Sequence, residues 1–63
     1  METLFIDTFI GVVKLVHNYN DVIGLDYYNV YSDSGRYIGD LWSANIGYSL
    51  EMDLKDFLIE KGY

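Results

Sequence analysis

The stretch YNVYSDSGRYIGDLW, residues 28–42, constrains the fold most, because it has the pattern of a β-hairpin. Aromatic and β-branched residues, which are enriched in strands, flank a polar tip at residues 33–35. Gly35 can take the positive φ that a three-residue hairpin loop with a bulge requires. We therefore predict that the chain turns back at this tip, with Tyr31 opposite Tyr37.

The hairpin as a whole is predicted over residues 25–42, and both of its faces carry large side chains. In this register, one face carries Tyr28, Val30, Ile38 and Trp42, and the other carries Tyr27, Tyr31, Tyr37 and Leu41. A hairpin that is covered on one side only normally alternates more cleanly between apolar and polar residues.

The segment before the hairpin, residues 3–17, permits two interpretations. Its apolar residues follow the i, i+3, i+4, i+7 spacing of one helical face, and we predict a helix here. Six β-branched residues lie between Ile6 and Val16, and Gly11 falls in the middle, both of which are unfavourable in a helix. A strand followed by a second strand is therefore the alternative.

Two further elements are predicted after the hairpin. Residues 45–52, NIGYSLEM, alternate apolar and polar positions, as a half-buried strand does. Residues 54–61, LKDFLIEK, fit a short helix, with Asp53 as N-cap and Gly62 just beyond its end. The predicted fold is α+β: a single domain over residues 1–63, with a three-stranded antiparallel β-meander between an N-terminal and a C-terminal helix.

This architecture leaves apolar sheet surface without a cover. The two terminal segments together can cover about one face of the meander, so one aromatic face of the hairpin is expected to point outward. An exposed aromatic patch on so small a chain marks an interaction site, and tyrosine and tryptophan are frequent in the energetic centres of interfaces. The predicted partner-binding residues are Asp26, Tyr27, Tyr31, Asp33, Arg36, Tyr37, Asp40 and Trp42.

The charge balance restricts the partners of such a surface. Ten acidic residues against four basic ones give a net charge of −6, which disfavours direct binding to nucleic-acid phosphates. It suits a larger protein with a basic surface. The N-terminal apolar stretch lacks the basic start of a signal peptide and contains Asp7 and Lys14, and it is too short and interrupted to span a membrane. We therefore expect a cytoplasmic protein, in the host cytoplasm if a phage encodes it.

The sequence gives little support for a catalytic site or a metal site. The chain has no cysteine and one histidine, His17, so no cofactor or metal site is predicted. In the predicted register, Asp26 and Asp40 are diagonal neighbours about 7–8 Å apart on one face, without a nucleophile beside them. His17 could pair with Asp21, but no catalytic motif surrounds either residue. We expect the chain not to be an enzyme.

Two functions remain as hypotheses. In size and charge alone, the chain resembles small acidic proteins of phages and mobile elements that inhibit host defence and nucleic-acid enzymes. The hypothesis that we favour is a non-catalytic binding protein that inhibits or modulates a host nuclease or another nucleic-acid-binding protein, with carboxylates imitating phosphates. The alternative is a small homo-oligomeric structural module, for example a homodimer that pairs through the predicted edge strand 45–52.

Overall fold

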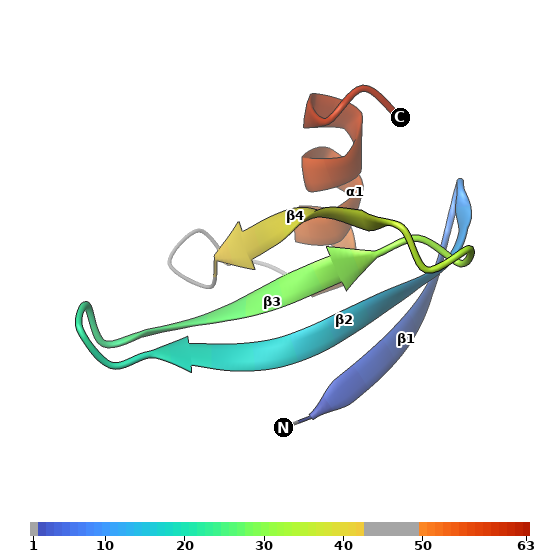
Figure 1. Cartoon of the computed structure of the whole chain (residues 1–63). Helices are drawn as coiled ribbons and strands as arrows, with labels where there is room; N and C mark the ends of the chain where they lie inside the picture. Colours follow the sequence, from blue (N-terminus) through green and yellow to red (C-terminus); the bar gives the residue numbers. More distant parts are fainter. Residues whose placement is uncertain (1, 43–49) are drawn as a thin grey trace.

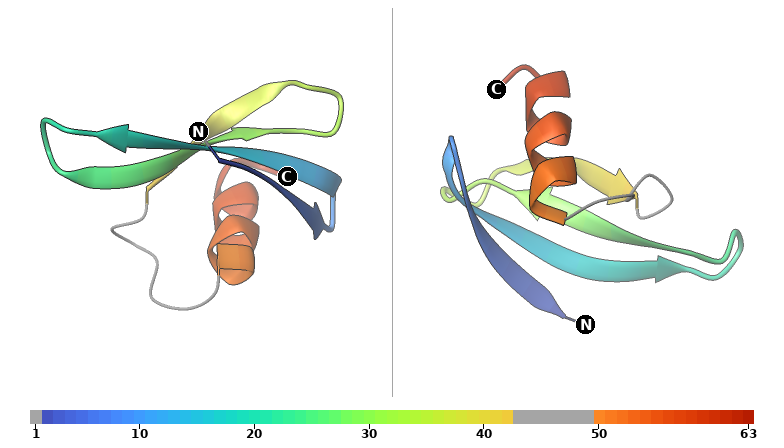
Figure 2. Two further views of the ribbon diagram at one scale, coloured as in Figure 1. Left: turned by 90° about the horizontal axis from the view of Figure 1, so that it is seen from below. Right: turned by 180° about the vertical axis from the view of Figure 1, so that it is seen from behind.

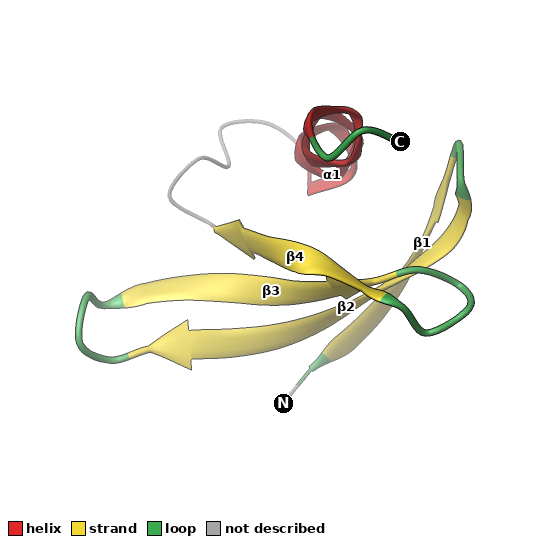
Figure 3. Ribbon diagram, turned by 45° about the horizontal axis from the view of Figure 1, so that its top comes forward, coloured by secondary structure: helices red, strands yellow, loops and turns green. Residues whose placement is uncertain are grey.

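The computed structural model describes residues 2–42 and 50–63, which form one antiparallel sheet and one helix (Figure 1). The elements are β1 (Thr3–Thr8), β2 (Gly11–Asn20), β3 (Leu25–Tyr31), β4 (Tyr37–Trp42) and α1 (Leu50–Glu60). The strands are hydrogen-bonded in the order β1-β2-β3-β4, so each strand pairs with its neighbour in the sequence. The helix α1 lies on one side of this sheet (Figures 2 and 3).

The predicted fold class is wrong in its strand count and in its N-terminal element. Residues 3–17 form β1 and most of β2, and the described residues include no N-terminal helix. The two strands pair in register from Thr3 opposite Val16 to Thr8 opposite Gly11. The β-branched residues and Gly11 decide the outcome, because they favour strands and a turn over a helix. The alternative interpretation, two successive strands, is confirmed.

The predicted strand 45–52 is also corrected. Residues 45–49 lie outside the described residues, whereas residues 50–52 begin α1. Leu50 starts a helical stripe that continues at Leu54 and Leu58, so its apolar character serves a helix and not an alternating strand. Asp53 accordingly lies in the first turn of α1 and is not its N-cap.

The end of α1 agrees with the sequence prediction. Gly62 has a φ of +93°, and its N–H donates to the carbonyl of Ile59 at 3.0 Å. The N–H of Tyr63 donates to the carbonyl of Leu58, also at 3.0 Å. This pair of bonds is the Schellman motif, for which glycine is the preferred residue.

The β3–β4 hairpin keeps the predicted turn but changes register beyond it. Tyr31 lies opposite Tyr37, as predicted, and Gly35 has a φ of +88°. A β-bulge then shifts the pairing, so that Val30 lies opposite Gly39. Because successive side chains alternate between faces, this one-residue shift exchanges the faces of the following residues in β4.

The exchange is visible at the end of β4. Leu41 lies opposite Tyr28 and joins the α1 side of the sheet, whereas Trp42 lies opposite Tyr27 on the other side. The predicted face sets, which placed Leu41 with Tyr27 and Trp42 with Tyr28, are therefore wrong at these positions.

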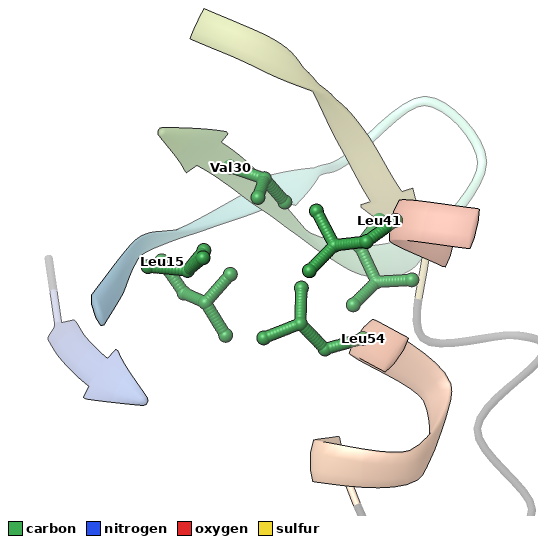
Figure 4. Close-up of a cluster of buried hydrophobic side chains, with 6 residues drawn as sticks. Leu15, Val30, Leu41 and Leu54 are labelled. Carbon is green, nitrogen blue, oxygen red and sulfur yellow. The ribbon is translucent and has the colours of Figure 1, made fainter. Parts of the chain in front are cut away.

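The core lies between α1 and the sheet. Its buried residues are Val13, Leu15, Val30, Leu41, Leu54 and Leu58. Figure 4 shows Leu15, Val30 and Leu41 of three different strands pointing toward Leu54 of α1. One helix thus closes the apolar face of a four-stranded sheet.

Candidate protein-binding surface

The sheet face opposite α1, called the open face below, carries large side chains although no described element covers it (Figure 2). Because successive side chains of a strand alternate between the two faces, each residue of the open face lies between two residues of the α1 side along its strand. In β2, for example, Lys14 lies between the fully buried Val13 and Leu15. Phe5 of β1, opposite Lys14 in the ladder, is 69% exposed.

Two aromatic pairs lie across β3 and β4 on the open face. The rings of Tyr27 and Trp42 stack with centroids 4.5 Å apart and an interplanar angle of 25°. The rings of Tyr31 and Tyr37 lie 5.6 Å apart and are tilted by 58°. The Lys14 ammonium lies 5.0 Å from the centre of the Tyr31 ring, a cation–π contact.

A row of polar side chains crosses the open face between these aromatic pairs. The amide of Asn18 in β2 donates to Oδ1 of Asn29 in β3. Asn29 Nδ2 donates to Asp40 Oδ1 at 2.8 Å, and the Tyr37 hydroxyl donates to the same oxygen at 2.5 Å. The hydrogen bond to Asp40, a small desolvation and the carboxylate charge raise the pKa of Tyr37.

Beside this row, a cleft of about 420 Å³ separates β4 from α1. Its charged lining residues are Asp40, Asp53, Asp56, Glu60 and Lys61, and its largest apolar ones are Leu41, Trp42 and Phe57. The cleft therefore combines four carboxylates with one ammonium group. Oδ2 of Asp53 is buried and has no hydrogen-bond partner among the described residues.

Five of the eight predicted binding residues come together at this surface: Tyr27, Tyr31, Tyr37, Asp40 and Trp42. Asp33 and Arg36 lie instead in or beside the β3–β4 turn, where both are exposed. Asp33 contributes to a separate hollow of about 250 Å³ that Phe5 and Lys14 also line.

The predicted pair of Asp26 and Asp40 does not form, because the bulge moves Asp40 to the other face. Asp26 stays on the same face as Tyr28, as predicted. It belongs to the α1 side of the sheet, where its Oδ1 lies 2.9 Å from Nε2 of His17. Asp40 belongs to the open face. The described partner of His17 is likewise Asp26, not Asp21, because His17 lies opposite Tyr28 in the β2–β3 ladder.

Sequence reasoning missed the asparagine row and the acidic side of α1. Asn18 and Asn29 are uncommon residues for strand interiors, and this was the available signal for a polar row across the sheet. Asp53, Asp56 and Glu60 are spaced by three and four residues, which places them on one side of a helix.

Comparison with protein-family models, curated proteins and solved structures finds no match to this chain. The class of protein is therefore defined by the fold and the surface alone: a small α+β protein with one sheet face covered by a helix and an aromatic, polar face opposite. Across residues 2–42 and 50–63, no helix has the length and apolar character needed to cross a membrane. The same residues contain no group of three or more histidine or carboxylate side chains arranged for a metal ion.

Proposed function

We propose that the chain is a non-catalytic binding protein whose β4 margin contacts a larger protein with a basic surface. The observation that carries this proposal is that the open face and the acidic cleft meet at β4. Asp40 belongs both to the polar row of the open face and to the acidic cleft beside α1. Trp42 similarly stacks on Tyr27 and lines the cleft.

The aromatic pairs supply the apolar part of such a contact. Tyr37 is 52% exposed, so half of its surface remains available to a partner. Rings that are already held against one another lose little conformational freedom on binding, which favours affinity. Tyrosine and tryptophan are also the residues that most often dominate binding energy at interfaces.

The cleft supplies the electrostatic part. Asp53, Asp56 and Glu60 of α1 line the cleft together with a single lysine, Lys61. A lysine or arginine side chain from a partner would relieve this imbalance. The net charge of −6 would also accelerate association with a basic protein.

A nucleic-acid-binding protein or nuclease is the partner class that fits these features best, because its binding groove presents clustered lysine and arginine for phosphates. Carboxylates of this chain would occupy positions that phosphates otherwise take. The function proposed is accordingly inhibition or modulation of such a protein by competition for its groove.

The experiment compares three immobilised baits in extracts of the source cells. These are the wild type, Asp56→Lys in the cleft and Asp21→Lys in the remote β2–β3 turn, a control with the same change in charge. We expect wild type and Asp21→Lys to retain the same basic protein, and Asp56→Lys to lose it. Retention should fall steeply with salt, and added nucleic acid should compete.

Two other results would contradict a role of the cleft in binding. If all three baits retain the same proteins, the cleft has no role in binding. If Asp21→Lys and Asp56→Lys weaken retention equally, only the overall charge matters. A Trp42→Ala bait, checked for folding by circular dichroism, tests the aromatic part separately.

A further inference from the structure

The outer strand β1 has one backbone side with no strand beside it among the described residues. The N–H of His17 donates to the carbonyl of Glu2 at 2.8 Å, which identifies Glu2 and His17 as a hydrogen-bonded pair of the β1–β2 ladder. Hydrogen-bonded and non-hydrogen-bonded pairs alternate in an antiparallel ladder. The N–H and C=O groups of Thr3, Phe5 and Asp7 therefore point away from β2.

The sequence of β1 lacks the residues that normally prevent a further strand from pairing, and α1 comes near its C-terminal end, where Asp7 and Thr8 share a hollow with Lys55. The sequence of β1, TLFIDT, contains no proline, lysine or arginine, and its register with β2 has no irregularity. The opposite edge differs, because the β3–β4 ladder is bulged. Phe57 of α1 and Lys61, directly after the helix, also approach Gly39 of β4 so closely that an added Cβ would lie 3.2 Å from each.

We infer that β1 is a homodimer interface, at which β1 of a second copy pairs antiparallel with Phe5 opposite Phe5. The outward backbone groups belong to odd-numbered residues, so only odd-numbered residues can form hydrogen-bonded pairs across the interface. The register centred on Phe5 pairs all three of them, placing Thr3 opposite Asp7 twice. A register centred on Asp7 would instead place two carboxylates opposite each other.

The side chains are self-complementary in this register. Phe5 is 69% exposed in the single chain, and the two rings would pair across the interface on the open face. The Thr3 hydroxyl can donate to the Asp7 carboxylate of the other copy. On the α1 side, Leu4 would lie opposite Ile6, and both already pack against the core, so the two cores would become continuous.

A second copy is a better occupant than an unrelated strand because one segment supplies both halves of each pair. The chain also has a physical need for further burial, since only six residues in its described part form the buried core and there is no disulfide. The interface lies at the β1 margin of the sheet, so its test does not depend on the partner proposed for β4.

The primary experiment measures self-association by sedimentation velocity across about a hundredfold range of protein concentration. We expect a reversible shift from monomer to dimer. In parallel, amide exchange by NMR should show protection of Thr3, Phe5 and Asp7 that increases with concentration. Leu4 and Ile6, whose amides face β2, serve as internal references that stay protected in both states.

A pair of variants tests the register. Thr3→Asp places two carboxylates opposite each other at two symmetric positions and should weaken the dimer about tenfold. Adding Asp7→Thr to Thr3→Asp exchanges the two residues without changing the net charge of the wild type, and it should restore dimerisation. All three proteins keep the same residues on the α1 side, and circular dichroism checks that each folds.

Three results would overturn the inference. One is a wild type that stays monomeric at about 1 mM. Another is a dimer in which exchange at Thr3, Phe5 and Asp7 does not respond to concentration. The last is a double variant, Thr3→Asp with Asp7→Thr, that dimerises as weakly as Thr3→Asp alone. It would show that these residues do not face each other.

Discussion

At the scale of single residues, Asp40 connects the polar row of the open face with the acidic cleft. One of its oxygens accepts hydrogen bonds from Asn29 and from Tyr37, and the same residue lines the cleft next to α1. It therefore fixes the position of the exposed Tyr37 ring relative to the acidic cleft.

This connection predicts the titration of Tyr37. Its pKa is raised, mainly because its hydroxyl donates to Asp40. Since the folded pKa lies above the ordinary value of about 10, this bond supports the fold below about pH 10 and its contribution is lost as pH rises through the folded pKa. We expect Asp40→Asn to lower the pKa of Tyr37 toward its ordinary value, measured by NMR of ¹³C-labelled tyrosine.

Asp21→Asn provides the control for this titration, because it removes one carboxylate from the exposed β2–β3 turn and leaves the polar row intact. The pKa of Tyr37 should then stay as in the wild type. An equal fall in both variants would mean that the overall negative charge, not the hydrogen bond, raises the pKa.

The sequence predicted the positions of the tyrosines on the open face better than those of the carboxylates. Tyr27, Tyr31 and Tyr37 share one face, as the predicted register had it, whereas Trp42 joins them only because of the β-bulge. Asp40 could not be placed, because the bulge shifts the register of β4 by one residue and moves this side chain to the opposite face. Hydrogen-bonded rows such as Asn18 with Asn29 depend on strand pairing, which local patterns do not specify.

At the scale of elements, the turn between β3 and β4 depends on one glycine. Gly35 has a φ of +88°, and a Cβ built on it would meet no other atom within 4 Å. The cost of Gly35→Ala is therefore a backbone cost, about 1–2 kcal/mol in the free energy of unfolding. Gly35→Asn should cost less, because asparagine tolerates positive φ better. Urea denaturation measures both, and equal stability of Gly35→Ala and the wild type would contradict this account.

The helix α1 contributes the other half of the core, and this leads to a second prediction for an element. Leu54 is fully buried against the sheet, so Leu54→Ala should lower the free energy of unfolding by about 2–5 kcal/mol. Such a loss approaches the whole stability of a small domain, about 5 kcal/mol at the low end.

Ile59 on the same helix is the matched control. Its side chain is 54% exposed, so Ile59→Ala should change stability by no more than about 0.5 kcal/mol. Thermal unfolding followed by circular dichroism compares the two variants. Similar losses of stability for both variants would show that packing of the helix against the sheet does not account for the effect of Leu54→Ala.

The N-terminal strands illustrate why element types were only partly predictable. The spacing of Phe5, Ile6, Phe9 and Ile10 matches a helix, but it arises because β1 and β2 meet at a turn between Thr8 and Gly11. Helical and alternating patterns coincide over such short segments. The C-terminal helix was easier to recognise because its stripe and its Gly62 end signal agree.

At the scale of the whole molecule, negative charge outweighs positive charge by six. Self-repulsion of this kind opposes compaction, and salt screens it. We expect the Tm, measured at low protein concentration, to rise with added sodium chloride. The double variant Asp21→Lys with Glu51→Lys has a net charge of −2, because each replacement adds two positive charges to −6. Its Tm should rise less with added salt. A Tm that falls with salt would indicate that attractive ion pairs dominate.

The order of the elements has a consequence for the way the chain is made. All four strands precede α1 in the sequence, yet Leu54 and Leu58 of α1 complete the core. During synthesis, the hairpins can therefore leave the ribosome and pair locally while Val13, Leu15 and Leu41 still face water. Newly made chains thus expose the apolar face of the sheet until the helix emerges. During this interval they are most prone to aggregate or to need a chaperone.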